Sequence, residues 1–296
     1  VPPTQAWSGM TLGASEPWSC VTASSARSVE SITRGNHQSL VVIMTGFGTV
    51  ASHLGLPDAG LATYSDMVGR VKAMAGMVRA NGAAEVVVAD GSGIIRLPTS
   101  ANLTSTGMRA AAESAGARVL ALEDEPWVRL EPPDAKAIGH FYFSRPVYEA
   151  DVVINMPVIK THRFAEFSCS LKNFVGAVHP RYRPSVTFWS GDWHERIAEI
   201  NLAVHPVLTV ADGTTTMIDG GPTSGTPSKT DLLICSGDRV AVDLTAIALL
   251  RSFGTSSKLQ GRRIVDQRQI RRAAALGLGA GSGRGIELVT EAVDPA

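Results

Sequence analysis

Four side chains within residues 155–176 have types that could do chemistry together. Lys160 and His162 come after an apolar run at residues 152–154 that is typical of a buried strand, and Lys172 and Asn173 follow about ten residues later on a short predicted helix. Two lysines, a histidine and an asparagine at this spacing suit a site for an anion, a metal ion or both. The alternative interpretation is a solvated loop that carries ordinary surface lysines.

Acid–base chemistry is one use of such a cluster. A lysine desolvated in a cleft can act as an acid or a base, so Lys160 and His162 are the candidate catalytic residues. Lys172 and Asn173 are then the candidates for holding the anion. The chain has no Walker motif, no glycine fingerprint in the strand–turn–helix context of a dinucleotide site, and no G-x-S-x-G elbow.

Polar residues also follow other predicted strands. Strands are expected over residues 40–44, 85–89, 119–122, 152–154, 207–211 and 232–235, and the turns after them include Asp90, Asn155 and Asp212. In open parallel sheets the ligand crevice lies outside the carboxyl ends of the strands. We therefore expect these three residues, with Asp243 from the following helix, to bind substrate. Taken singly, each turn is equally well a strand terminus or a helix cap.

The elements that must position these residues alternate along the chain. An amphipathic helix is expected over residues 65–80, and further helices over 104–114, 240–250 and 264–275; the first two separate predicted strands. This alternation predicts an α/β fold in which a mostly parallel sheet is flanked by helices. We expect an N-terminal extension over residues 1–37 and one domain over 38–296, with a boundary between two lobes, if there are two, near 126–150.

A metal ion is a second use of the same region. His162, His179 and His194 lie within it, and imidazole suits Zn, Ni, Cu or Fe. The three histidines lack the H-x-x-x-H and H-E-x-x-H spacings, so a divalent metal site would have to be assembled from separate loops. The three cysteines lie far apart without a C-x-x-C pair, so the chain encodes neither a zinc ribbon nor an iron–sulfur cluster motif.

Composition narrows the range of partners. Lys and Arg together number 27, as do Asp and Glu, which argues against a general binder of nucleic acid and favours self-association into a homo-oligomer. No run of about 18 apolar residues predicts a membrane span. The chain begins at Val1 and its first 40 residues lack lysine, which favours an exported mature protein over a cytoplasmic one.

The motifs around these residues resemble those of the DUF362 family, a prokaryotic group of unknown function. The matching segments are Asn-Met-Pro-x-x-Lys-Thr-His at residues 155–162 and Leu-Lys-Asn-x-x-Gly at 171–176. Supporting segments lie at residues 82–90, 198–201, 220–225 and 237–243, so the resemblance covers roughly residues 38–255. It implies an α/β fold with a site at the strand ends.

Two features depart from the family pattern. The first strand of the family usually ends in Lys-Pro-Asn, whereas here Met44, Thr45 and Gly46 stand in that place. Many members also carry ferredoxin-like cysteine clusters, which this chain lacks. The family is distantly similar, in its strand–Lys–x–His segment, to the nickel-pincer lactate racemase group, in which histidines and lysines handle a metal cofactor and a proton or hydride.

Two functions of different classes follow. The first is an enzyme that acts on a small anionic substrate by acid–base chemistry of the isomerase or redox kind, with or without a metal ion. The alternative is a non-catalytic exported protein that reuses the fold as a self-assembling structural or filament subunit. The missing Lys-Pro-Asn, the zero net charge and the aromatic residues within 182–193 motivate this alternative.

Overall fold

The computed structural model describes residues 19–23, 40–45, 58–93, 97–187, 191–222, 224–255 and 257–292. Its strands are β1 (Ser19–Ala23), β2 (Leu40–Thr45), β3 (Glu85–Asp90), β4 (Arg118–Ala121), β5 (Trp127–Leu130), β6 (Phe141–Ser144), β7 (Val152–Met156), β8 (Val158–His162), β9 (Glu166–Ser168), β10 (Leu208–Gly220), β11 (Gly225–Ser236) and β12 (Leu288–Ala292). The α-helices are α3 (Asp58–Ala80), α4 (Thr99–Ser105), α5 (Met108–Ser114), α6 (Arg145–Tyr148), α7 (Ser170–Asn173), α8 (Arg183–Thr187), α9 (Trp193–Glu199), α10 (Arg239–Ser252), α11 (Ser257–Gln260) and α12 (Arg268–Ala275).

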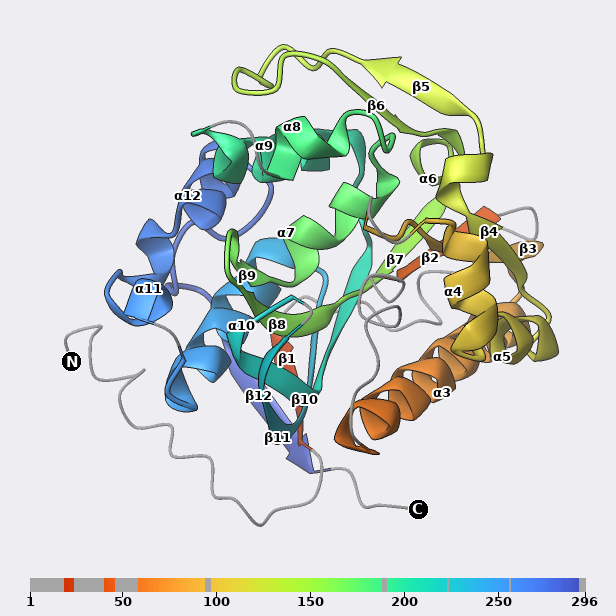
Figure 1. Cartoon of the computed structure of the whole chain (residues 1–296), viewed down its shortest axis with the longest axis horizontal. Helices are drawn as coiled ribbons and strands as arrows, with labels where there is room; N and C mark the ends of the chain where they lie inside the picture. Colours follow the sequence, from red (N-terminus) through yellow and green to blue (C-terminus); the bar gives the residue numbers. More distant parts are fainter. Residues whose placement is uncertain are drawn as a thin grey trace.

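One large sheet runs through the centre of the protein (Figure 1). Its strand order is β12-β1-β11-β10-β7-β2-β3-β4, with β8 and β9 attached beside β10. The neighbours from β10 through β7, β2 and β3 to β4 are parallel, whereas β11 runs antiparallel to β10. The expected mostly parallel α/β sheet is thus confirmed. Its strand β1 comes from residues 19–23, within the segment expected as an N-terminal extension.

Helices cover both faces of this sheet. Val41 and Ile43 pack on one face with α3, α4 and α5, and Val42 and Met44 pack on the other with α7, α9, α10 and α12. Figure 1 shows these two groups of helices on opposite sides of the strands. The unbroken apolar run of β2 is explained by this double burial, because neighbouring residues of a strand point to opposite faces.

The β10–β11 hairpin corrects the sequence prediction. Strands were expected only over residues 207–211 and 232–235, but both continue far beyond those limits. The threonines at 214–216 favour extended backbone, and the chain turns only at Gly220 and Gly221, whose φ angles are positive. Asp212 therefore lies inside a strand and not at a strand end.

Other boundaries differ for local reasons. The helix expected over residues 104–114 is two helices, because Gly107 adopts a φ of 77° between α4 and α5. The hairpin β5–β6 forms a separate two-stranded sheet near the expected lobe boundary, yet Phe141 and Phe143 join the same apolar cluster as Phe174. Among the described residues, no helix combines the length and apolar composition needed to cross a membrane.

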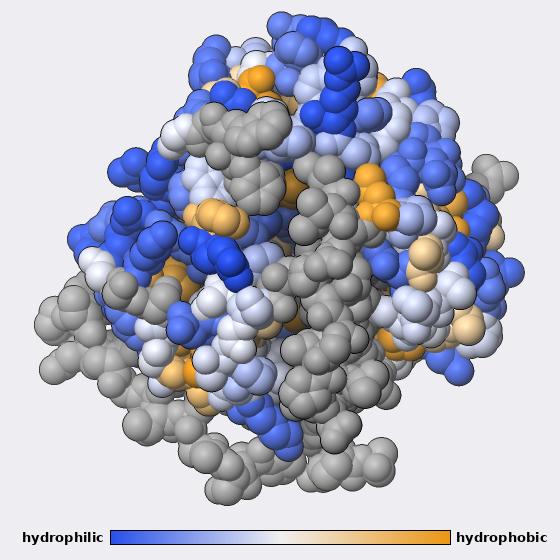
Figure 2. Space-filling model, viewed as in Figure 1, coloured by the Kyte–Doolittle hydropathy of each residue, from blue (hydrophilic) through white to orange (hydrophobic). Residues whose placement is uncertain are grey.

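The described surface is mostly hydrophilic on the face shown in Figure 2, with apolar residues in small separate patches. The exposed large apolar residues come from different parts of the chain: Met77, Leu97, Tyr148, Phe164 and Val289. Scattered residues of this kind are usual on protein surfaces. The expected homo-oligomer stays a prediction.

Candidate functional site

Lys160 and His162 lie in a buried strand and not in the loop that their polarity suggested. Pro157 separates β7 from β8, and β8 then pairs with the far half of β10 on one side and with β9 on the other. Residues two apart in a strand point to the same face, so Lys160 and His162 share a face of β8. Both are buried, which excludes the interpretation as ordinary surface residues.

Few nearby groups offset the cost of burying the Lys160 ammonium group. Its side chain is only 7% exposed. Burial lowers the pKa of Lys160 to about 8, and the nearby Asp90 carboxylate opposes that shift. Within the described part of the chain, its Nζ has neither a hydrogen bond nor a close ion pair.

Even fewer groups offset the cost of removing the Lys172 ammonium group from water. It is the third residue of α7, which packs against β7, β9 and α10 (Figure 1). Burial and then the charge of Lys160 lower the pKa of Lys172 to about 7. None of the described carboxylates offsets this shift, so the two lysines form a cationic pair within reach of each other's field.

His162 completes this cluster as a neutral ring. The backbone N–H groups of Phe164 and Ala165 donate to its Nδ1 at 3.3 and 3.1 Å. A ring nitrogen that accepts carries no proton, so the proton of the neutral ring is on Nε2. Burial, then Lys172 and Lys160, hold the pKa of His162 well below its usual value. The ring is therefore neutral at pH 7 and can donate from Nε2.

Asn155 and Asn173 form an amide network at the end of β7. Asn155 Nδ2 donates to the hydroxyl and carbonyl oxygens of Ser170 at 3.0 and 3.2 Å, and its Oδ1 accepts from Asn173 at 2.7 Å. Asn173 also donates to the carbonyl of Met44 at 3.3 Å. The network joins β7, β2 and α7. Of the two amides, Asn173 keeps an oxygen without a described partner.

Asp243 lies beside the same helix. Its carboxylate accepts from the backbone N–H groups of Ser170 and Leu171 at 2.6 and 3.1 Å. Burial raises the pKa of Asp243 to about 7, although these two hydrogen bonds oppose the shift. The carboxylate therefore caps α7 from a distant helix, because α7 has no side-chain cap of its own.

The other two expected carboxylates differ in their surroundings. Asp90 ends β3, accepts from Thr45 Oγ1 at 2.9 Å and lies close enough to Lys160 to stabilise its charge. Asp212 instead forms an ion pair with Arg70 of α3 and accepts from Thr214. Asp90 thus lies near Lys160. Asp212 instead pairs with Arg70 of α3, which covers the opposite face of the sheet from α7.

The three candidate metal-binding histidines do not form one group. His179 packs against Trp127 and Tyr142 of the β5–β6 hairpin, and His194 lies against Trp193 in α9. No three His, Cys, Asp or Glu side chains in the described ranges are grouped so as to hold a metal ion. Burial and then Arg268 lower the pKa of His194 to about 4, so this ring is neutral.

Arg183 is a buried residue that sequence reasoning missed. Its guanidinium donates to the carbonyl oxygens of Val178 at 2.6 Å and Gly176 at 2.7 Å, and also to that of Ser92. Gly91 lies next to Gly176, where a Cβ on Gly91 would come within 2.1 Å of the Gly176 carbonyl oxygen. Arg183 thus joins the turn after β3 to the segment after α7. No local pattern signals this role.

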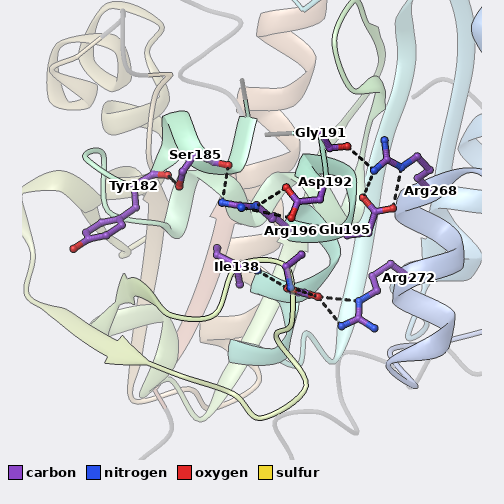
Figure 3. Close-up of polar contacts among 11 residues, drawn as sticks. Ile138, Tyr182, Ser185, Gly191, Asp192, Glu195, Arg196, Arg268 and Arg272 are labelled. Atoms are coloured by element: carbon purple, nitrogen blue, oxygen red, sulfur yellow. Dashed lines mark hydrogen bonds and ion pairs between the residues drawn. The ribbon is translucent and has the colours of Figure 1, made fainter. Parts of the chain in front are cut away.

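A polar network closes the outer side of α9. Arg268 of α12 binds Glu195 and the carbonyl of Gly191, and Arg196 binds Asp192 (Figure 3). The Arg268 contacts fix α9 against α12, whereas the Arg196–Asp192 pair lies at the start of α9 itself.

Comparisons with known proteins agree with the motifs. The model of the DUF362 family, described as a domain of unknown function, matches residues 57–248, well over half of the chain. The thylakoid-associated protein sll1697 of Synechocystis is 29% identical over 129 residues, which are 40% of this chain and 38% of that protein. The chain therefore spans well under half the length of this curated relative. The lactate racemase apoprotein of Thermoanaerobacterium thermosaccharolyticum is 13% identical, covers 71% of this chain and 48% of its own, and has a TM-score of 0.45.

Proposed function

The chain belongs to the DUF362 family, whose description assigns no function, and we propose that it is an enzyme that transfers protons on a small anionic substrate. One observation carries the proposal. Lys160 is buried and Lys172 is partly buried, the charge of Lys160 lowers the pKa of Lys172, and the only carboxylate that offsets either pKa shift within the described residues is Asp90.

Two ammonium groups in this setting destabilise each other. Transfer from water into a protein interior is costly for each charge, and mutual repulsion adds to that cost. A small carboxylate or phosphate near both Nζ atoms would replace lost water contacts and reverse the repulsion. Binding such an anion would also raise the pKa values of both lysines.

The two lysines suit different roles. The Asp90 carboxylate favours the protonated form of Lys160, so we propose that Lys160 binds the anion. Lys172 has a pKa of about 7, which matches an acid–base group at neutral pH. His162 contributes an Nε2 proton, and Asn173 contributes its amide oxygen. These roles exchange the two lysines relative to the assignment expected from the sequence.

Asn155 and Asp243 act through α7 in this proposal. Each has its hydrogen-bonding groups directed at Ser170 or its neighbours, so each would position Lys172 without touching substrate. The described residues provide no group of ligands for a metal ion, and no step of the proposal depends on one.

Thermal unfolding with added anions tests the proposal. Oxalate and inorganic phosphate should raise the melting temperature of the full chain at pH 7, because a ligand that binds only the folded state stabilises it. Lys160→Met and Lys172→Met should each weaken the affinity by about tenfold or more. Lys229→Met is the matched control, since Lys229 is 78% exposed and pairs with Asp231. Equal anion effects in the wild type and in the Lys160→Met/Lys172→Met double variant would overturn the proposal.

A further inference from the structure

An exposed aromatic side chain lies among basic residues at the turn between β8 and β9. Phe164 in this turn is 50% exposed, Arg163 precedes it, and Lys258 of α11 lies against the same turn. One exposed apolar residue means little by itself, but its combination with cations has a specific use. We propose that the surface formed by Arg163, Phe164, Lys258 and Arg262, which we call the basic turn surface, binds a membrane that contains anionic lipids.

Contacts among these residues place them on one continuous surface. The ammonium group of Lys258 donates to the carbonyl oxygen of Arg163 at 3.5 Å. The Arg262 guanidinium pairs with Glu166 at 3.5 Å, and the Arg262 side chain is 40% exposed. Helix α11 also contacts β9, which begins directly after the turn. The basic side chains therefore lie around the turn that carries Phe164.

The backbone of this turn is held from both of its ends. The N–H groups of Phe164 and Ala165 donate to His162 Nδ1 at 3.3 and 3.1 Å. Gln269 of α12 donates to the carbonyl oxygen of Ala165 at 2.9 Å. A side chain on a fixed backbone loses less conformational freedom on binding than one that must first be ordered. The turn thus presents the Phe164 ring ready for binding.

Positive charge is concentrated in the segment that borders the turn. Residues 251–272 contain seven Lys and Arg residues and one acidic residue, although the whole chain has zero net charge. Glutamates of α9 pair with Arg268 and Arg272. Arg163 and Lys258 are exposed, and neither forms an ion pair with a carboxylate in the described ranges. Their charges are therefore available to an external anion.

Phe164 distinguishes between the possible anionic partners. Lipid headgroups provide phosphate anions for the basic side chains, and the boundary with the acyl chains accepts an apolar ring. Binding of single-stranded nucleic acid relies on several aromatic rings along a basic groove, so that successive bases can stack. Of the exposed large apolar residues that the structure describes, only Phe164 belongs to this surface. One apolar ring among cations fits a membrane better.

Co-sedimentation of the full chain with vesicles tests the proposal. One set of vesicles is phosphatidylcholine alone, and the other contains equal amounts of phosphatidylcholine and phosphatidylglycerol. Binding to the anionic vesicles should be at least about tenfold tighter, because each basic residue near such a surface contributes roughly fivefold. About 1 M NaCl should remove most of this difference by screening the charges.

Substitutions with matched controls locate the binding surface. Lys258→Met should weaken binding to the anionic vesicles about fivefold, and Phe164→Ser by about fivefold or more. Phe164→Trp should bind at least as tightly as the wild type, because Trp favours the membrane interface. Lys72→Met and Met77→Ser are the controls and should bind as the wild type does. Both residues are exposed on α3, which covers the opposite face of the sheet.

Three results would overturn the proposal. The first is wild-type binding by both Lys258→Met and Phe164→Ser. The second is equal binding to the two kinds of vesicle, or binding to neither. The third is tight binding of single-stranded poly(U) without binding to vesicles, which would assign the basic turn surface to nucleic acid.

Discussion

At the scale of single residues, the proposed function depends on the buried Lys160 and the partly buried Lys172. The pKa of each is below its ordinary value because burial disfavours the charged form. When both lysines are protonated, they lower the free energy of unfolding, since water solvates them freely in the unfolded chain. The cost points to a role that a methionine or leucine could not supply.

The stability of the fold should therefore rise with pH in the alkaline range. Between about pH 7 and 10.5 the unfolded chain binds more protons at Lys172 than the folded chain, so the free energy of unfolding increases with pH there. Lys172→Met removes this cost and should stabilise the fold by about 2–5 kcal/mol below pH 7. The gain should decline as the pH rises from 7 to 10.5.

Urea unfolding of the wild type and Lys172→Met at several pH values measures this difference. Lys72→Met is the matched control, because Lys72 is exposed on α3 and its replacement removes no burial cost. A gain for Lys172→Met that stays constant from pH 6 to 10 would contradict a lowered pKa for Lys172.

At the scale of elements, α7 shows how a short helix is positioned by others. It has four residues and no side-chain cap of its own, and the Asp243 carboxylate from α10 takes the place of that cap. The hydrogen bonds of Asn155 and Asn173 fix its other side. The position of Lys172 thus depends on residues up to 71 positions away along the chain.

Asp243→Asn should loosen α7. An asparagine offers one oxygen where Asp243 offers two, and its NH₂ group would face a backbone N–H, so we expect a loss of about 2–4 kcal/mol. Oxalate affinity should fall about tenfold as Lys172 shifts. Urea unfolding and oxalate titration measure the two effects. Asp266→Asn is the control, because Asp266 forms an exposed pair with Arg263. If Asp243→Asn destabilised the chain no more than this control, Asp243 would not cap α7.

The elements also show what a sequence can predict. The strands β2 and β3 were predicted because apolar β-branched runs mark a strand buried on both faces. Strand β8 was missed because Pro157 and the polar Lys160 and His162 resemble a loop, and the burial of these side chains depends on β10. Asp212 with Gly213 resembles a turn, yet Arg70 from a distant helix neutralises Asp212 within a continuous strand.

The lysine cluster itself was predicted, since its members share one segment of 22 residues. Arg183 was not, because its partners are main-chain oxygens at Ser92, Gly176 and Val178, which any residue type can provide. The partner of Lys160 was foreseen only as one of several strand-end carboxylates. Which carboxylate lies beside it depends on the strand order, and spacing alone does not determine that order.

At the scale of the whole molecule, Glu199 joins three distant segments on one side of the sheet. It is fully buried and accepts from the backbone N–H groups of Ala137 and Ile138, with a shortest distance of 2.8 Å to each. It also pairs with Arg272 of α12 at 2.6 Å, and Arg272 in turn donates to the carbonyl of Asp134. The segment after β5, helix α9 and helix α12 are thus held at one carboxylate.

Glu199→Ala should destabilise the fold by about 3–5 kcal/mol, because Arg272 and two backbone N–H groups would lose their acceptor in a buried setting. Urea unfolding measures this loss, with Glu113→Ala as the control; its exposed pair with Arg109 should contribute less than about 1 kcal/mol. Hydrogen exchange gives a local readout, in which the amides of Ala137 and Ile138 should lose protection before those of β2. Unchanged protection at both amides would mean that Glu199 does not hold this side of the molecule together.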